Sequence, residues 1–69
     1  MTWSDAILTV LRETGEPMAF KDVSAEILRR HLADPGVRNV DILTHAEMTR
    51  LQNRGLVASA PRGKYRISE

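Results

Sequence analysis

Cysteine is absent from this 69-residue sequence, so the chain has neither a disulfide framework nor a thiolate zinc site to stabilise its fold. Aromatic residues are few, at 4%, and no apolar run approaches the roughly 18 residues of a membrane span. The N-terminal stretch carries Asp5 where a signal peptide would have a positive charge and an apolar segment. We therefore expect a domain held by its hydrophobic core, with or without a dimer partner, that makes no membrane contact and is cytoplasmic (nucleoid-associated) or nuclear.

The sequence also lacks the residue clusters that catalysis and metal binding require. Its two histidines, His31 and His45, fall on different predicted helices, and their spacing matches no zinc pattern. It has no phosphate-cradling glycine loop and no carboxylate pair spaced for a catalytic site. We expect no enzyme, and hence no catalytic residue, metal, cofactor or small-molecule substrate. A histidine near a helix end, as His31 is, more often interacts with the helix dipole than with a metal.

What remains is the composition of one folded domain spanning residues 1–69, with 42% hydrophobic and 28% charged residues. The net charge is only +1, but it is unevenly spread. Residues 1–34 hold four basic and six acidic side chains, whereas residues 35–69 hold six basic and three acidic. Residues 50–66 contain five cations and no acid, a local excess that attracts phosphate groups. A solvated basic face is the alternative explanation.

Capping signals and apolar spacing predict two helices in the N-terminal half. The first begins near Trp3, because Thr2 and Asp5 have the spacing of a capping box, and it ends at Gly15. A very short strand is expected near residues 18–20, after Pro17. The second helix is predicted over Lys21 to Leu32, with Val23, Ile27 and Leu28 facing inward.

A third helix and a β-hairpin are predicted in the C-terminal half. Pro35 and Gly36 end the preceding segment, Asn39 or Asp41 can cap a helix over about 40–54, and Gly55 closes it. Two strands are then expected over residues 56–59 and 64–68, joined by a turn at residues 60–63. Three helices followed by a hairpin predict an α+β fold of the winged helix-turn-helix type, in which the two-stranded hairpin over residues 56–68 is the wing.

The third helix has two distinct sides on a helical wheel. The inward set is Val40, Thr44, Met48 and Leu51, with Arg50 at the border. The opposite set is Ile42, His45, Ala46, Thr49 and Asn53. Short polar and methyl-bearing side chains of this kind suit a helix in a DNA major groove, where they can contact base edges. Glu47 falls close to the inward side, and we expect its carboxylate to reach toward Arg50 or Arg54.

Side-chain alternation in the hairpin places its cations together. Arg62, Lys64 and Arg66 are predicted to point to one face, and Tyr65 and Ile67 to the other. A basic stripe can lie along a phosphate backbone or in a minor groove. The alternative is a charged edge that discourages aggregation.

Four segments, WSDAIL (3–8), GEPM (15–18), LQNRGLV (51–57) and RGKY (62–65), together with the order of the elements, resemble winged-helix domains. The nearest likeness is to the HARE-HTH type, and the N-terminal domain of Mrr-type restriction proteins is similar as well. The resemblance implies DNA binding, usually beside an effector domain. The sequence departs from the family pattern at Ala19, where a Ser or Thr often caps the second helix, so we expect that helix to start less firmly by about 1 kcal/mol.

These patterns predict a double-stranded-DNA-binding module, with the third helix in the major groove and the hairpin on the backbone or in the minor groove. It would serve a transcriptional regulator or recognise DNA within a larger system. The predicted base-contacting residues are His45, Ala46, Thr49, Arg50 and Asn53. The predicted phosphate-contacting residues are Arg38, Arg54, Arg62, Lys64 and Arg66. The alternative is a protein-interaction or homodimerisation module without DNA contact, which outward-facing Ile42 and Leu43 would favour.

Overall fold

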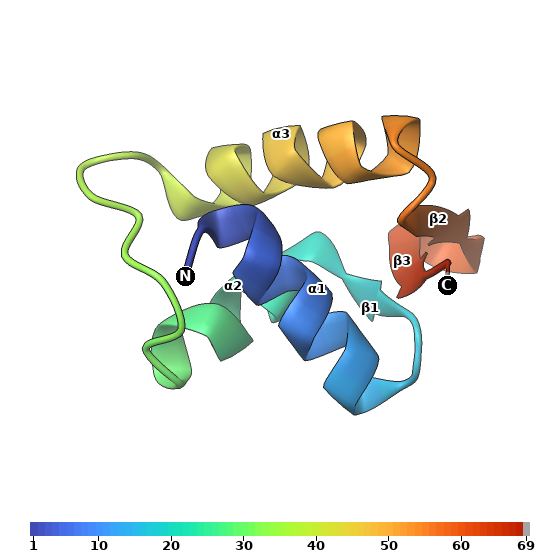
Figure 1. Ribbon diagram of the computed structural model, residues 1–69, viewed down its shortest axis with the longest axis horizontal. Coiled ribbons are helices and arrows are strands. Elements are labelled where there is room, and N and C mark those ends of the chain that lie inside the picture. The colour runs from blue at the N-terminus through green and yellow to red at the C-terminus, as the bar shows by residue number, and fades with distance from the viewer. Residues whose placement is uncertain (69) are drawn as a thin grey trace.

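The computed structural model describes residues 1–68 and shows three helices and a small antiparallel sheet (Figure 1). The elements are α1 (Trp3–Thr14), β1 (Met18–Ala19), α2 (Phe20–Arg29), α3 (Val40–Asn53), β2 (Val57–Ala60), a 3₁₀ turn (Pro61–Gly63) and β3 (Lys64–Ile67). In Figure 1, α3 runs along one side of the molecule, α1 and α2 lie beneath it, and the hairpin lies at its C-terminal end. The predicted α+β winged-helix order is therefore confirmed.

Both ends of α1 follow from local sequence signals. The Thr2 hydroxyl accepts a hydrogen bond from the Asp5 amide at 3.1 Å, which satisfies one of the unpaired amides of the first turn. At the other end Gly15 has φ 69°, and its amide donates to the Leu11 carbonyl at 3.0 Å. The predicted start and end of this helix are both confirmed.

The second helix differs from its prediction at both ends. It begins at Phe20 after the extended residue Ala19, whose side chain offers no capping acceptor. It ends at Arg29, three residues before the predicted Leu32, because His31 adopts a left-handed conformation with φ 53°. The His31 and Leu32 amides then bond back to the last helical turn, the Schellman arrangement in which glycine is usual. A non-glycine residue in that conformation gives little sequence signal, so the prediction ran too far.

The inner face of α2 is also shifted from the predicted one. Val23 and Ile27 are fully buried, as predicted, but Leu28 is 41% exposed. Ser24 is buried instead, one turn before Leu28 and closer to the middle of the inner face. The inward prediction for Leu28 was therefore wrong, because a polar residue was not expected to take the position facing α3.

The third helix matches its predicted cap and end. The Asn39 side chain accepts hydrogen bonds from the amides of Asp41 and Ile42, at 3.0 and 3.1 Å. Gly55, with φ 77°, follows the helix end. Residues 30–39 connect α2 to α3, a longer connection than the roughly three- or four-residue turn of a simple helix-turn-helix.

A buried hydrogen-bonded chain fixes the three helices to one another inside the hydrophobic core. The Trp3 indole N–H of α1 donates to the Thr44 hydroxyl of α3 at 2.8 Å. The Thr44 and Ser24 hydroxyl oxygens lie 2.7 Å apart, and the Ser24 hydroxyl is 3.0 Å from the Phe20 carbonyl. If Thr44 donates to Ser24 and Ser24 to Phe20, every hydrogen in the chain is used. Among residues 1–68, no buried side-chain nitrogen or oxygen lacks a partner.

The sheet has the order β1-β3-β2, so β3 is its central strand. The two-residue β1 confirms the expected short strand near 18–20, and Met18 pairs with Tyr65. The first hairpin strand covers residues 57–60 where 56–59 was predicted, and the second covers residues 64–67 where 64–68 was predicted. The alternation of side chains applies to Lys64 and Arg66, which are in β3, but not to Arg62, which lies in the turn with φ 67°. Arg62 thus lies within the predicted turn, and strand alternation was the wrong basis for placing it on the same face as Lys64 and Arg66.

Candidate nucleic-acid interface

One side of α3 faces away from the core along its whole length (Figure 1). The five predicted base-contacting residues are all exposed on this helix, at least in part: His45, Ala46, Thr49, Arg50 and Asn53. The inward side is equally well defined, because Thr44, Met48 and Leu51 are almost fully buried and Val40 is half-buried. The helix is therefore anchored by one side and free to contact a partner with the other.

The N-terminal half of this outward side is apolar. Ile42 is 71% exposed, and the Phe20 and His45 rings meet edge to face with centroids 5.6 Å apart. Together with Asp41 and Ala46, these residues line a shallow hollow of about 360 Å³. Leu43, which was expected to be exposed beside Ile42, is buried at 7%. That expectation was wrong because Leu43 belongs to the buried core cluster, which also contains Trp3 and Ile7 of α1.

Toward its C-terminal half, α3 carries an ion pair at the edge of the outward side. Arg50 Nη1 lies 3.2 Å from Glu47 Oε1, as the i, i+3 spacing predicted. The other Glu47 oxygen accepts a hydrogen bond from the Ser4 hydroxyl of α1 at 2.6 Å. No sequence pattern indicated this second contact, because the two residues are 43 positions apart. Ser4 is thus a residue of the candidate interface that sequence reasoning missed.

The hairpin presents its cations on the face opposite its apolar residues. Lys64 and Arg66 are exposed and pair across the ladder with Ala60 and Ala58, whereas Tyr65 and Ile67 pack against the core. Because alanine side chains are short, they leave the two cations prominent on that face. The Gln52 amide donates to the Ser59 hydroxyl at 2.5 Å, which ties β2 to the last turn of α3.

The remaining predicted phosphate contacts lie at the two ends of α3 and in the hairpin turn. Arg38 is exposed just before α3, where its Nε donates to the Pro35 carbonyl at 3.2 Å. Arg54 is the exposed C-cap residue of α3, and Arg62 is exposed in the turn between the strands. The structure places all ten predicted contact residues on the surface, and their roles in binding stay predictions.

Acidic residues elsewhere are partly neutralised by neighbouring arginines. Arg30 Nη1 lies 2.5 Å from Glu13 Oε2, and this hydrogen bond lowers the pKa of the Glu13 carboxyl. Arg29 contacts Glu26 at 2.9 Å and lowers the pKa of that carboxyl in the same way. Both pairs involve α2 rather than α3.

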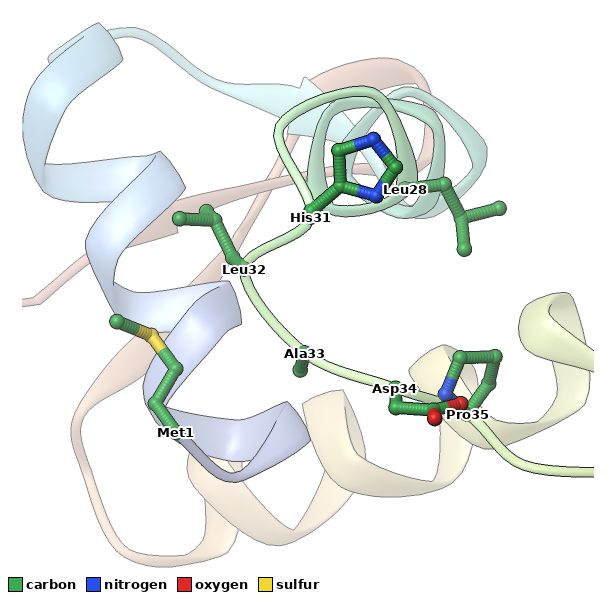
Figure 2. Close-up of a pocket in the computed structure, with 7 residues that line it drawn as sticks. All are labelled: Met1, Leu28, His31, Leu32, Ala33, Asp34 and Pro35. Carbon is green, nitrogen blue, oxygen red and sulfur yellow. The ribbon is translucent and has the colours of Figure 1, made fainter.

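A second hollow, of about 520 Å³, lies under the connection between α2 and α3 (Figure 2). Figure 2 shows its lining residues: Met1, Leu28, His31, Leu32, Ala33, Asp34 and Pro35. One imidazole and one carboxylate are its titratable side chains, which is too few for a metal site. Within residues 1–68, no group of three potential metal ligands is found, and no helix is both long and apolar enough to cross a membrane.

Comparison with known proteins identifies a family. Residues 1–47 match the model of the HARE-HTH family, a helix-turn-helix domain whose description names ASXL proteins and restriction endonucleases. The search of curated proteins gave no match, and the search of solved structures gave none either. The family match covers α1, α2 and the first half of α3, which is 47 of the 69 residues, and the helices and sheet have the winged-helix arrangement. The chain therefore belongs to the HARE-HTH family.

Proposed function

We propose that this domain binds double-stranded DNA, with α3 in the major groove and the hairpin on the phosphate backbone or in the minor groove. The observation that carries the proposal is the outward side of α3, where short polar residues and one arginine are exposed on a helix that is anchored from behind. A helix presented in this way fits the width of a major groove. HARE-HTH is a helix-turn-helix family that generally binds DNA, which supports the proposal.

The exposed groups divide into two roles. Thr49 and Asn53 can exchange hydrogen bonds with base edges, so they would select sequence. The hairpin cations Arg62, Lys64 and Arg66 would contact phosphates, which fixes the position of the protein but carries no sequence information. The domain would thus supply DNA recognition to a transcriptional regulator or to a larger DNA-acting system.

Titration of the domain into a random-sequence duplex at two salt concentrations tests the proposal. Each phosphate contact contributes about 0.9 to the slope of log K against log salt, so the double variant Arg62→Ala, Lys64→Ala should bind every sequence more weakly and lower that slope by roughly 2. Arg29→Ala is a charge control, because it removes an exposed cation from α2. Affinity that does not change with salt would rule out phosphate contact.

Selection from a library of duplexes tests the separate role of α3. Thr49→Ala or Asn53→Ala should change which sequences are preferred while leaving the salt slope nearly unchanged. Uniform losses from these variants and from the hairpin variant would contradict the division of roles.

A protein partner is the second candidate, and the exposed Ile42 beside an apolar hollow is the observation that favours it. Sedimentation at micromolar concentration distinguishes the two. A dimer that is lost in Ile42→Ala, together with salt-independent or undetectable DNA binding, would favour protein interaction.

A further inference from the structure

The Glu47 carboxylate is held between two helices, and this arrangement sets the position of an arginine on the candidate interface. The Glu47 side chain is 17% exposed, whereas its partner Arg50 is 75% exposed. Each carboxylate oxygen has its own partner, the Ser4 hydroxyl at 2.6 Å and Arg50 Nη1 at 3.2 Å. The acid is therefore the fixed member of the pair and the arginine the accessible one.

The position of the carboxylate is set by α1. Ser4 lies in the first turn of α1, where the helix dipole favours a negative charge. Its neighbour Trp3 bonds to Thr44, which lies one turn before Glu47 on α3. Trp3 and Ser4 of α1 thus hydrogen-bond to residues in two successive turns of α3. The bond from Ser4 orients the Glu47 side chain. Arg50 then bonds to a carboxylate that is already in place.

An arginine held in this way differs from a free surface arginine. The bond to Glu47 uses one nitrogen, Nη1, and leaves the other guanidinium nitrogens of Arg50 able to donate. The nearby negative charge also weakens the attraction of the guanidinium for phosphate. A guanidinium that is oriented and partly neutralised suits directional contact with a base edge, and guanine, with its O6 and N7 acceptors, is the base that arginine contacts most often.

We propose that Ser4 and Glu47 are positioning residues that hold Arg50 for contact with a guanine and keep it from the phosphate backbone. This inference rests on the proposed DNA binding. It adds that the contacts from Ser4 to Glu47 and from Glu47 to Arg50 help to determine which base is selected. It also gives the Ser4 side chain a role beyond stabilising its own helix.

The test compares wild type with Glu47→Gln, which keeps the size of the side chain and one carbonyl oxygen as an acceptor but removes its charge. Two probes are used: a random-sequence duplex at two salt concentrations, and a library of duplexes with randomised central base pairs. Wild type should enrich guanine at one position. The Glu47→Gln variant should lose that enrichment, bind the random duplex several-fold more tightly, and steepen the salt slope by about 0.9, because Arg50 becomes free to contact a phosphate.

Two further variants separate positioning from structural support. Arg50→Ala should lose the guanine enrichment without binding the random duplex more tightly. Ser4→Ala should change the base preference and the salt slope in the same direction as Glu47→Gln, but to a smaller extent. If Glu47→Gln does not fold, Ser4→Ala serves as the test in its place. A purely structural role would instead weaken all binding equally and leave the preference unchanged.

The outcomes distinguish this inference from the proposed function. Wild type and the Glu47 and Ser4 variants could all bind DNA in a salt-dependent way with the same base preference and the same salt slope. That result would overturn the positioning role alone. Absence of wild-type binding to any duplex would overturn both.

Discussion

Replacing Thr44 by valine tests the buried hydrogen-bonded chain that orients α3. Thr44 is fully buried and Trp3 is 6% exposed, and the Trp3 indole N–H donates to the Thr44 hydroxyl at 2.8 Å. Valine has nearly the same shape as threonine but cannot accept that bond. Ser24 can still donate to the Phe20 carbonyl, so the Trp3 N–H is the group left without a partner.

The expected cost follows from that single unpaired donor. A buried N–H without an acceptor costs about 1 to 3 kcal/mol, and in a domain of this size each kcal/mol lowers the Tm by roughly 4–8 °C. Thr44→Ser is the matched control, because it keeps the oxygen and removes one methyl group at a cost of about 1 kcal/mol.

Denaturant and thermal unfolding measure the effect, and a double-mutant cycle assigns it to the pair. In a Trp3→Phe background no indole N–H remains, so Thr44→Val should cost much less there than in wild type. Equal costs in the two backgrounds would show that the bond contributes nothing. Wild-type stability of Thr44→Val itself would refute the reasoning outright.

Three other changes have defined outcomes for stability. His31→Gly should raise the free energy of unfolding by roughly 0.5–1 kcal/mol, because φ 53° is strained for a residue with a Cβ. Thermal unfolding measures this gain, and the control variant His31→Ala should show none. Ala19→Ser should add about 1 kcal/mol by supplying the absent cap of α2, and an unchanged Tm would contradict it. The Glu13 pKa is lowered from 4.5 by Arg30, so its stabilising effect is present above that pH and is lost as the pH falls through the lowered value. Glu13→Gln should therefore flatten the fall of Tm below pH 4.5, and an identical acid profile would show that the pair has no effect.

The features that sequence predicted correctly are those determined by residues close together in the chain. Thr2 and Asn39 cap their helices because a short polar side chain lies two or three residues before an unpaired amide. Gly15 and Gly55 end their helices because glycine adopts positive φ at little cost. Apart from Leu43, the outward and inward sides of α3 followed from helical spacing alone.

The features that sequence missed depend on tertiary contacts. Leu28 and Leu43 lie at the margins of their helices' apolar sides, where the neighbouring elements decide whether a residue is covered. The early end of α2 depends on His31 adopting a left-handed backbone conformation, which is unfavourable for a non-glycine residue. The contact of Ser4 with Glu47 joins residues 43 positions apart, and no local pattern predicts it. The outward side of α3 was thus predictable, and the α1 contact that orients part of it was not.

Chemical-shift mapping of the labelled domain during titration with duplex DNA tests most directly whether α3 and the hairpin form the binding surface. We expect the largest changes at the amides of Thr49, Asn53 and Lys64, with their neighbours in α3 and the hairpin also affected. Changes confined to α1, or no changes at any DNA concentration, would contradict the proposed interface.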